Sequence, residues 1–157
     1  MKLLTKAIRE NLIANGKAQA PVRGTEDEID FKPVVKLFTP DAGAIWLLTE
    51  LDPEEPDIAF GLCDLGVGCP ELGSVRISEI DQVRGRLGLP VERDGFFEAG
   101  KTLNAYAIEA MSLGRITRPD ALRSATGPTP VAGFCARRLR MSILALGKKW
   151  LEIPARK

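Results

Sequence analysis

Two neighbouring apolar segments constrain the fold of this chain more than any other feature. Residues 44–51 and 58–65 each have the length of a strand, and the turn-forming stretch Pro53 to Pro56 separates them. Strands joined by so short a connection pair antiparallel. If Asp52 stands opposite Asp57, side-chain alternation defines one core-facing set. That set is Ile45, Leu47, Thr49, Leu51, Ile58, Phe60, Leu62 and Asp64.

The opposite face of this predicted hairpin places one large side chain beside small ones. Trp46, with Leu48 and Glu50, faces the row Ala59, Gly61 and Cys63. We predict that a helix covers the indole, because sheets of this size commonly carry helices on one or both faces. Burial by a partner protein is the alternative.

The flanking segments extend the hairpin into a small sheet. Residues 34–38 and 72–77 read as further strands, and residues 91–97 as a shorter one. Helical spacing and capping residues predict helices over residues 4–15, 78–87 and 103–113, the first ended by Asn15-Gly16 and the last by Gly114. The sequence therefore predicts an α+β domain over residues 1–116. It is a small antiparallel sheet, a meander of about four to five strands, packed with three to four short helices.

Beyond that domain, residues 117–157 form a separate segment. Prolines and glycines cluster between residues 119 and 130, as in a linker, and apolar residues then recur at helical spacing from Cys135 to Leu146. The candidate phosphate contacts on this basic amphipathic segment are Arg137, Arg138, Arg140, Lys148 and Lys149. Binding to nucleic acid, to an anionic membrane surface, or simple packing as a helix on the domain all remain open.

Charge is segregated along the chain although its net value is only +1. Residues 1–24 carry a net +4, residues 25–81 a net −11, and residues 82–157 a net +8. Such segments can neutralise one another within the fold or face different partners. The sequence also contains no histidine, which excludes Ser-His and Cys-His nucleophiles and removes the commonest metal ligand.

Acidic residues around the central strands give the candidate binding surface, which consists of Trp46, Glu50, Asp52, Asp64 and Glu71. Carboxylates of this kind can hold Mg²⁺ for phosphoryl transfer only when they converge. In the register given above, Glu50 and Asp64 emerge on opposite faces of the sheet. We therefore predict no catalytic residue, no metal site and no cofactor.

Location is indicated by what the sequence lacks. No apolar run approaches the roughly 18 residues of a membrane span, and charged side chains interrupt the first apolar stretch. The three cysteines, Cys63, Cys69 and Cys135, fit neither a disulfide framework nor a Cys-x-x-Cys site. We expect a cytoplasmic protein without integral membrane association.

The runs Trp46 to Pro53, Asp57 to Gly66 and Arg84 to Asp94 carry a family resemblance. Over roughly residues 1 to 116 the sequence resembles the bacterial domain-of-unknown-function family twenty-nine fifty-eight. The resemblance implies a small cytoplasmic protein, often encoded on plasmids and other mobile elements, with no established activity. We therefore expect a non-enzymatic accessory or protein-interaction module with an unknown protein partner. The alternative is a nucleic-acid-binding or metal-dependent nucleic-acid-processing protein using the acidic centre and the basic C-terminal half.

Overall fold

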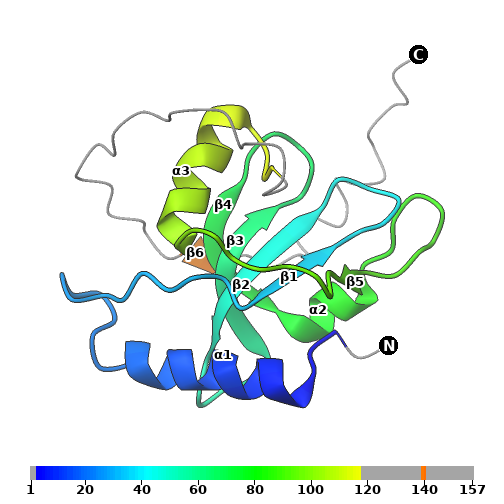
Figure 1. The fold of residues 1–157 in the computed structure, drawn as a ribbon. Helices are drawn as coiled ribbons and strands as arrows, with labels where there is room; N and C mark the ends of the chain where they lie inside the picture. Colours follow the sequence, from blue (N-terminus) through cyan, green and yellow to red (C-terminus); the bar gives the residue numbers. More distant parts are fainter. Residues whose placement is uncertain (1–2, 118–138, 141–157) are drawn as a thin grey trace.

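The computed structural model describes residues 3–117 and 139–140, and within them it confirms the α+β class. The sheet is antiparallel apart from the last short strand, and three helices pack around it (Figure 1). The elements follow in the order α1 (Lys6–Gln19), β1 (Val35–Phe38), β2 (Ile45–Leu51), β3 (Ile58–Asp64), β4 (Glu71–Arg76), α2 (Ile77–Gln82), β5 (Glu92–Arg93), α3 (Leu103–Leu113) and β6 (Leu139–Arg140).

The strands are ordered β5-β1-β2-β3-β4-β6 across the sheet. The run from β1 to β4 is the predicted meander, because each strand pairs with the next through a short turn. β6 pairs parallel with β4, with Leu139 opposite Gly73. The helix predicted across residues 135–146 is therefore wrong at Leu139 and Arg140, where the chain is extended and supplies partners for backbone groups at the outer edge of β4.

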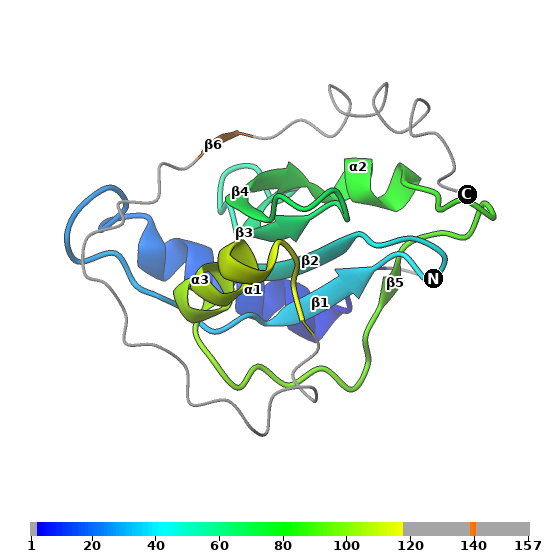
Figure 2. The same cartoon turned by 90° about the horizontal axis from the view of Figure 1, so that it is seen from above.

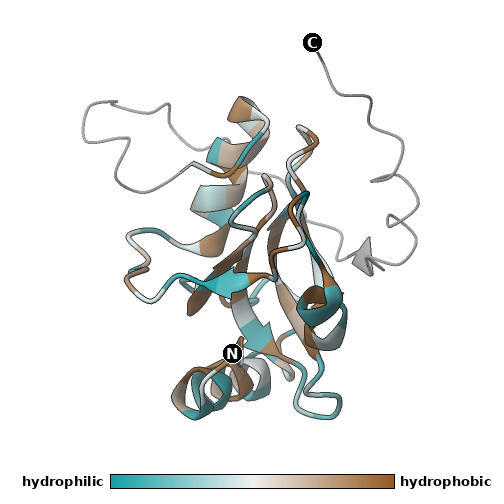
Figure 3. Ribbon diagram, turned by 90° about the vertical axis from the view of Figure 1, so that its right-hand side faces the viewer, coloured by the Kyte–Doolittle hydropathy of each residue, from teal (hydrophilic) through white to brown (hydrophobic). Residues whose placement is uncertain are grey.

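Both faces of the sheet are buried under helices. Trp46, Leu48 and Leu12 belong to one apolar cluster, on the face covered by α1 and α2. Leu47, Leu62 and the buried side of α3 form a second cluster on the opposite face. Figure 3 shows the largely brown strands lying between α1 below and α3 above. Trp46 is fully buried, so the prediction that a helix covers the indole is confirmed.

α1 is longer than predicted. It begins after Thr5, whose hydroxyl accepts a hydrogen bond from Ile8 N at 3.2 Å, and it continues past Gly16 to Gln19. Gly16 was expected to end the helix in a left-handed conformation. Instead it lies inside the helix, where a Cβ atom would collide with the carbonyl oxygen of Leu51. The glycine therefore allows α1 to approach β2 closely, and does not stop the helix.

α2 is shorter than predicted. The expected helix over residues 78–87 ends at Gln82, and residues 84–90 form a loop closed by a bridge between Arg84 and Pro90. Ser78 does not cap the helix, because the N-cap residue is Arg76, which makes no capping hydrogen bond with its own side chain. Asp57 caps the helix from outside, accepting hydrogen bonds from Ser78 N at 2.9 Å and Ser78 Oγ at 2.7 Å. The strand predicted over residues 91–97 is reduced to Glu92–Arg93.

A β-bulge at Thr49 changes the register of the central hairpin. The predicted pairing holds from Ile45 to Leu48, but Glu50 then stands opposite Phe60 and Leu51 opposite Ala59. Past the bulge, alternation is reversed, so Leu51 joins the α1 face and Glu50 turns to the α3 face. Leu51 is therefore buried in the core as predicted, but on the opposite face of the sheet from the one predicted. Thr49 is held in place by its own hydroxyl, which donates to Phe60 O at 3.2 Å.

Candidate interaction cleft

The structure does not gather the sequence-derived candidate residues into one exposed surface. Trp46 is buried under α1, and Glu71 is exposed at the start of β4. Glu50 and Asp52 do lie together, because the Arg23 guanidinium is 3.6 Å from Glu50 Oε1 and 3.5 Å from Asp52 Oδ2. Glu50 is nevertheless inaccessible, with 2% of its surface exposed.

Asp52 organises the hairpin tip. Its Oδ1 accepts hydrogen bonds from Glu54 N at 2.9 Å and Glu55 N at 3.2 Å. The hydrogen bond from Glu54 N, with the further contacts to Glu55 and Arg23, holds the pKa of Asp52 below its usual value, although partial burial works in the opposite direction. This carboxylate therefore stays ionised and serves as a turn cap.

Asp64 is engaged on both oxygens. Oδ1 accepts from Gly66 N and Oδ2 from Ile116 N, each at 2.8 Å, and the side chain is buried. Contrary to the sequence-based register, Glu50 and Asp64 do share a face of the sheet. They remain separate, since Glu50 stands opposite Phe60, four residues from Asp64 on β3, or about 13 Å along a strand. Within residues 3–117 and 139–140, no group of three or more His, Cys, Asp or Glu side chains could hold a metal ion.

The candidate phosphate contacts fall almost wholly outside the described residues. Arg137, Arg138, Lys148 and Lys149 lie there, and of Arg140 only the backbone, in β6, is described. Cys63 is buried opposite Glu71, and burial, with a smaller contribution from that carboxylate, raises the pKa of its thiol to about 12. A thiol so protected is unreactive near neutral pH.

A cleft of about 730 Å³ opens at the end of the β1–β2 hairpin. One wall is the turn Thr39–Ala44 with the strand ends Phe38 and Ile45, and the other is the segment from Arg93 to Glu98. We call this the interaction cleft and the second wall the cleft loop. Seen from above, the hairpin, β5 and the loop after α2 lie at the same end of the molecule (Figure 2).

Asp94 fixes the conformation of the cleft loop. Its Oδ2 accepts from the buried Lys36 Nζ at 2.9 Å, its backbone N donates to Lys36 O at 3.0 Å, and its Oδ1 accepts from Phe96 N at 3.1 Å. Phe97 is turned inward, with Lys36 Nζ 5.9 Å from its ring centroid. The neighbouring Phe96 is therefore turned outward and is 98% exposed.

The other side of the hairpin turn anchors residues 84–90. Asp41 Oδ2 accepts a hydrogen bond from Leu87 N at 2.5 Å, and a Cβ atom at Gly85 would collide with the same carboxylate. Leu87 is 81% exposed as a result, and Leu89 is exposed beside it. This end of the molecule thus presents three apolar side chains to solvent from anchored loops.

A family described as "Protein of unknown function (DUF2958)" matches residues 3–117. The chain belongs to this family. The resemblance found in the sequence is thereby confirmed. Neither the curated proteins nor the solved structures include a significant match to the chain.

The interaction cleft of this DUF2958 protein was missed by sequence reasoning. Its clearest signal was the pair Phe96-Phe97 directly after Asp94-Gly95, since adjacent residues of an extended segment cannot both face the core. The cleft also needs Lys36, which lies 58 residues from Asp94, and no local pattern joins the two. None of the helices among residues 3–117 is long and apolar enough to span a membrane.

Proposed function

We propose that this DUF2958 protein is a non-enzymatic accessory module that binds a protein partner at the interaction cleft. The observation that carries the proposal is Phe96, which is 98% exposed yet lies on a loop fixed by the partly buried ion pair of Lys36 and Asp94. An exposed aromatic side chain on a fixed loop beside a cleft is typical of a protein interface. Leu87 and Leu89 extend the apolar surface at this end of the molecule.

The charges lining the cleft favour a protein over a nucleic acid. Lys36 is paired with Asp94, the Arg93 guanidinium donates a hydrogen bond to Leu3 O on the α1 face, and Glu98 adds a negative charge to the cleft. Binding to a phosphate backbone depends on an excess of positive charge, which these residues do not provide. Among the described residues, Glu50 and Asp64 also stay apart, so nothing there favours the nucleic-acid-processing alternative.

The cellular setting of the proposal rests on the family. Family resemblance supports a cytoplasmic accessory protein of a plasmid or other mobile element. The genes beside the coding sequence provide an inexpensive test, since replication, transfer or defence genes are expected there. A chromosomal setting among unrelated metabolic genes would argue against that part of the proposal.

The binding role is tested by quantitative capture with the full chain from cells that carry the encoding element. Phe96→Ser is compared with Leu113→Ser, which alters a side chain of α3 that is 51% exposed. Loss of a central aromatic anchor is worth about 2 kcal/mol or more, so we expect at least roughly tenfold less partner with Phe96→Ser. The Leu113→Ser variant should retain it.

Both variants change exposed residues, so their melting temperatures should match that of the parent chain. A partner that is captured equally by both variants would place the interface elsewhere. A chain that enriches no protein above the tag control would contradict the binding role itself.

A further inference from the structure

The positive charges at the interaction cleft are already engaged. Lys36 is 7% exposed and forms its ion pair with Asp94 Oδ2 at 2.9 Å. Arg93 pairs with Leu37 in the sheet, which directs its side chain to the α1 face. There its Nη1 donates to the carbonyl oxygen of Leu3 at 3.3 Å. Neither cation is therefore available to a ligand in the cleft.

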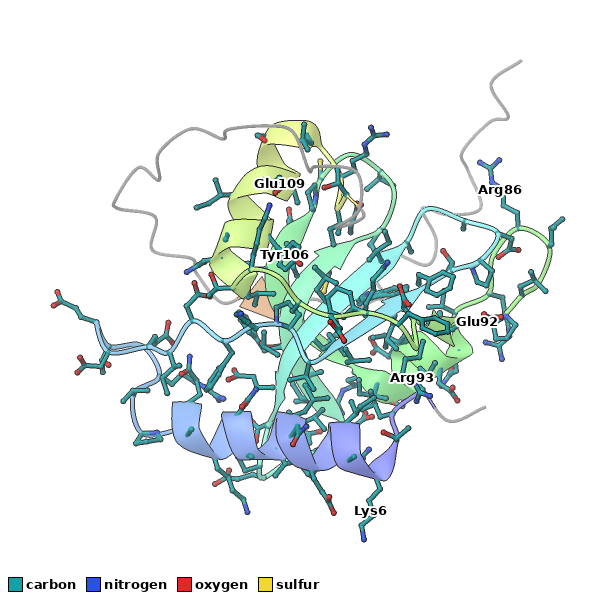
Figure 4. The ribbon with its side chains drawn as sticks, viewed as in Figure 1. Lys6, Arg86, Glu92, Arg93, Tyr106 and Glu109 are labelled. Carbon is teal, nitrogen blue, oxygen red and sulfur yellow. The ribbon has the colours of Figure 1, made fainter. Side chains whose placement is uncertain are left out.

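Two acidic side chains remain on the cleft side. Glu98 lines the cleft and is exposed. Glu92 is also exposed, and it stands opposite Phe38, so it shares that residue's face of the sheet. Figure 4 shows Glu92 and Arg93 at the right-hand end of the sheet, below Arg86. Neither Glu92 nor Glu98 forms an ion pair with any residue in the described part of the chain.

Three phenyl rings add to this negative potential. Phe38, Phe96 and Phe97 line the cleft, and the face of an aromatic ring attracts cations. The structure already contains one such contact, because Lys36 Nζ lies 5.9 Å from the Phe97 centroid with the Asp94 carboxylate beside it. Phe96 and Glu98 line the same cleft and are both exposed, and Glu98 forms no ion pair with a cation of the described residues.

We propose that the interaction cleft takes a lysine or arginine side chain from a protein partner. Its aliphatic stem packs against the phenyl rings, and its charged end lies near Glu98 and Glu92. This inference rests on the proposed function, because it specifies the chemistry of the same partner. A neutral apolar side chain would leave the two carboxylates partly desolvated without compensation, and an acidic one would be repelled.

The test is an NMR titration of the isotope-labelled full chain with N-acetyl-arginine amide and its neutral isostere N-acetyl-citrulline amide. We expect the arginine probe to shift the backbone amides of Gly95 and Phe96, with an affinity at least about threefold above that of the citrulline probe. Glu98→Gln should lower the affinity for arginine about threefold while leaving the citrulline titration unchanged. Glu26→Gln removes the same charge from an exposed loop residue and should have no effect.

Other results would overturn the inference in distinguishable ways. Equal binding of both probes, or preference for N-acetyl-phenylalanine amide at the same amides, would make the occupant apolar while leaving the cleft a protein-binding site. Stronger shifts with an oligothymidylate would make it a nucleic-acid site. Shifts that grow with protein concentration and vanish in Phe96→Ser would identify a second copy of the chain as the occupant. If no probe shifts these amides, the inference fails, whereas the role of Phe96 is decided by capture alone.

Discussion

Asp64→Asn separates a structural role of this residue from a chemical one. The buried carboxylate accepts from Gly66 N through one oxygen and from Ile116 N through the other, both at 2.8 Å. Asparagine keeps the shape but has a single acceptor oxygen, so its amide group must face one of the two backbone donors. A hydrogen bond to a charged group contributes about 1.5–3 kcal/mol, and the orphaned buried N–H adds to the loss.

We therefore expect Asp64→Asn to lower the free energy of unfolding by about 2–3 kcal/mol. With a urea slope of about 2 kcal/mol per molar, the midpoint of unfolding falls by roughly 1–1.5 M. Glu71→Gln is the matched control, because Glu71 is an exposed acid of the next strand and its change should stay within about 0.5 kcal/mol. Hydrogen exchange should also accelerate at the amide of Gly66 or of Ile116, whichever of the two loses its acceptor.

Equal urea midpoints for Asp64→Asn and Glu71→Gln, with the amides of Gly66 and Ile116 both still protected, would refute this prediction. The hydrogen bonds of Asp64 would then contribute little, and its carboxylate would again be a candidate for chemistry.

Two further predictions follow from close contacts of the fold. Gly16→Ala should destabilise the chain by about 1–3 kcal/mol in thermal melts, despite the better helix propensity of alanine, because its Cβ atom collides with Leu51 O; a stabilised variant would contradict the packing described. Burial alone would raise the pKa of Asp57, but hydrogen bonds from Ser78 and Arg76 hold it below its usual value. Its contribution to stability is therefore present above about pH 4 and lost as the pH falls through the lowered pKa. Circular dichroism melts should show a shallower decline below pH 4 in Asp57→Asn than in the parent, and parallel curves would refute this.

Local sequence patterns were sufficient to predict an element when residues typical of a helix or strand end stand at both of its ends. Thr102 precedes α3 and Gly114 ends it with φ at +66°, a left-handed conformation that glycine adopts without strain. The central hairpin was equally clear, because its turn residues and its apolar segments agree. In both cases the deciding residues are close in the sequence, since Thr102 and Gly114 are 12 positions apart and the hairpin from Ile45 to Asp64 spans 20 residues.

Features set by distant residues could not be predicted in this way. The bulge at Thr49 is supported by Asn15 of α1, whose Nδ2 donates to Thr49 O at 2.8 Å from 34 residues away. The loop after α2 is held by Asp41, 46 residues before Leu87. The interaction cleft likewise depends on the pairing of Lys36 with Asp94. Sequence periodicity carries no information on such contacts. They explain the errors in strand register and helix length, and they explain why the interaction cleft was not predicted.

The acidic residues in the middle of the chain hold the helices against the sheet, and this explains the position of the cleft. Both faces of the central strands are apolar, so helices must cover each of them. The acids beside these strands hold the covering segments. Glu50 pairs with Arg23 beyond α1, Asp57 caps α2, and Asp64 binds the backbone after α3. These carboxylates are occupied in fixing the helices, which is why the proposed binding site lies at the end of the sheet. There Glu92 and Glu98 remain exposed beside the phenylalanines of the cleft.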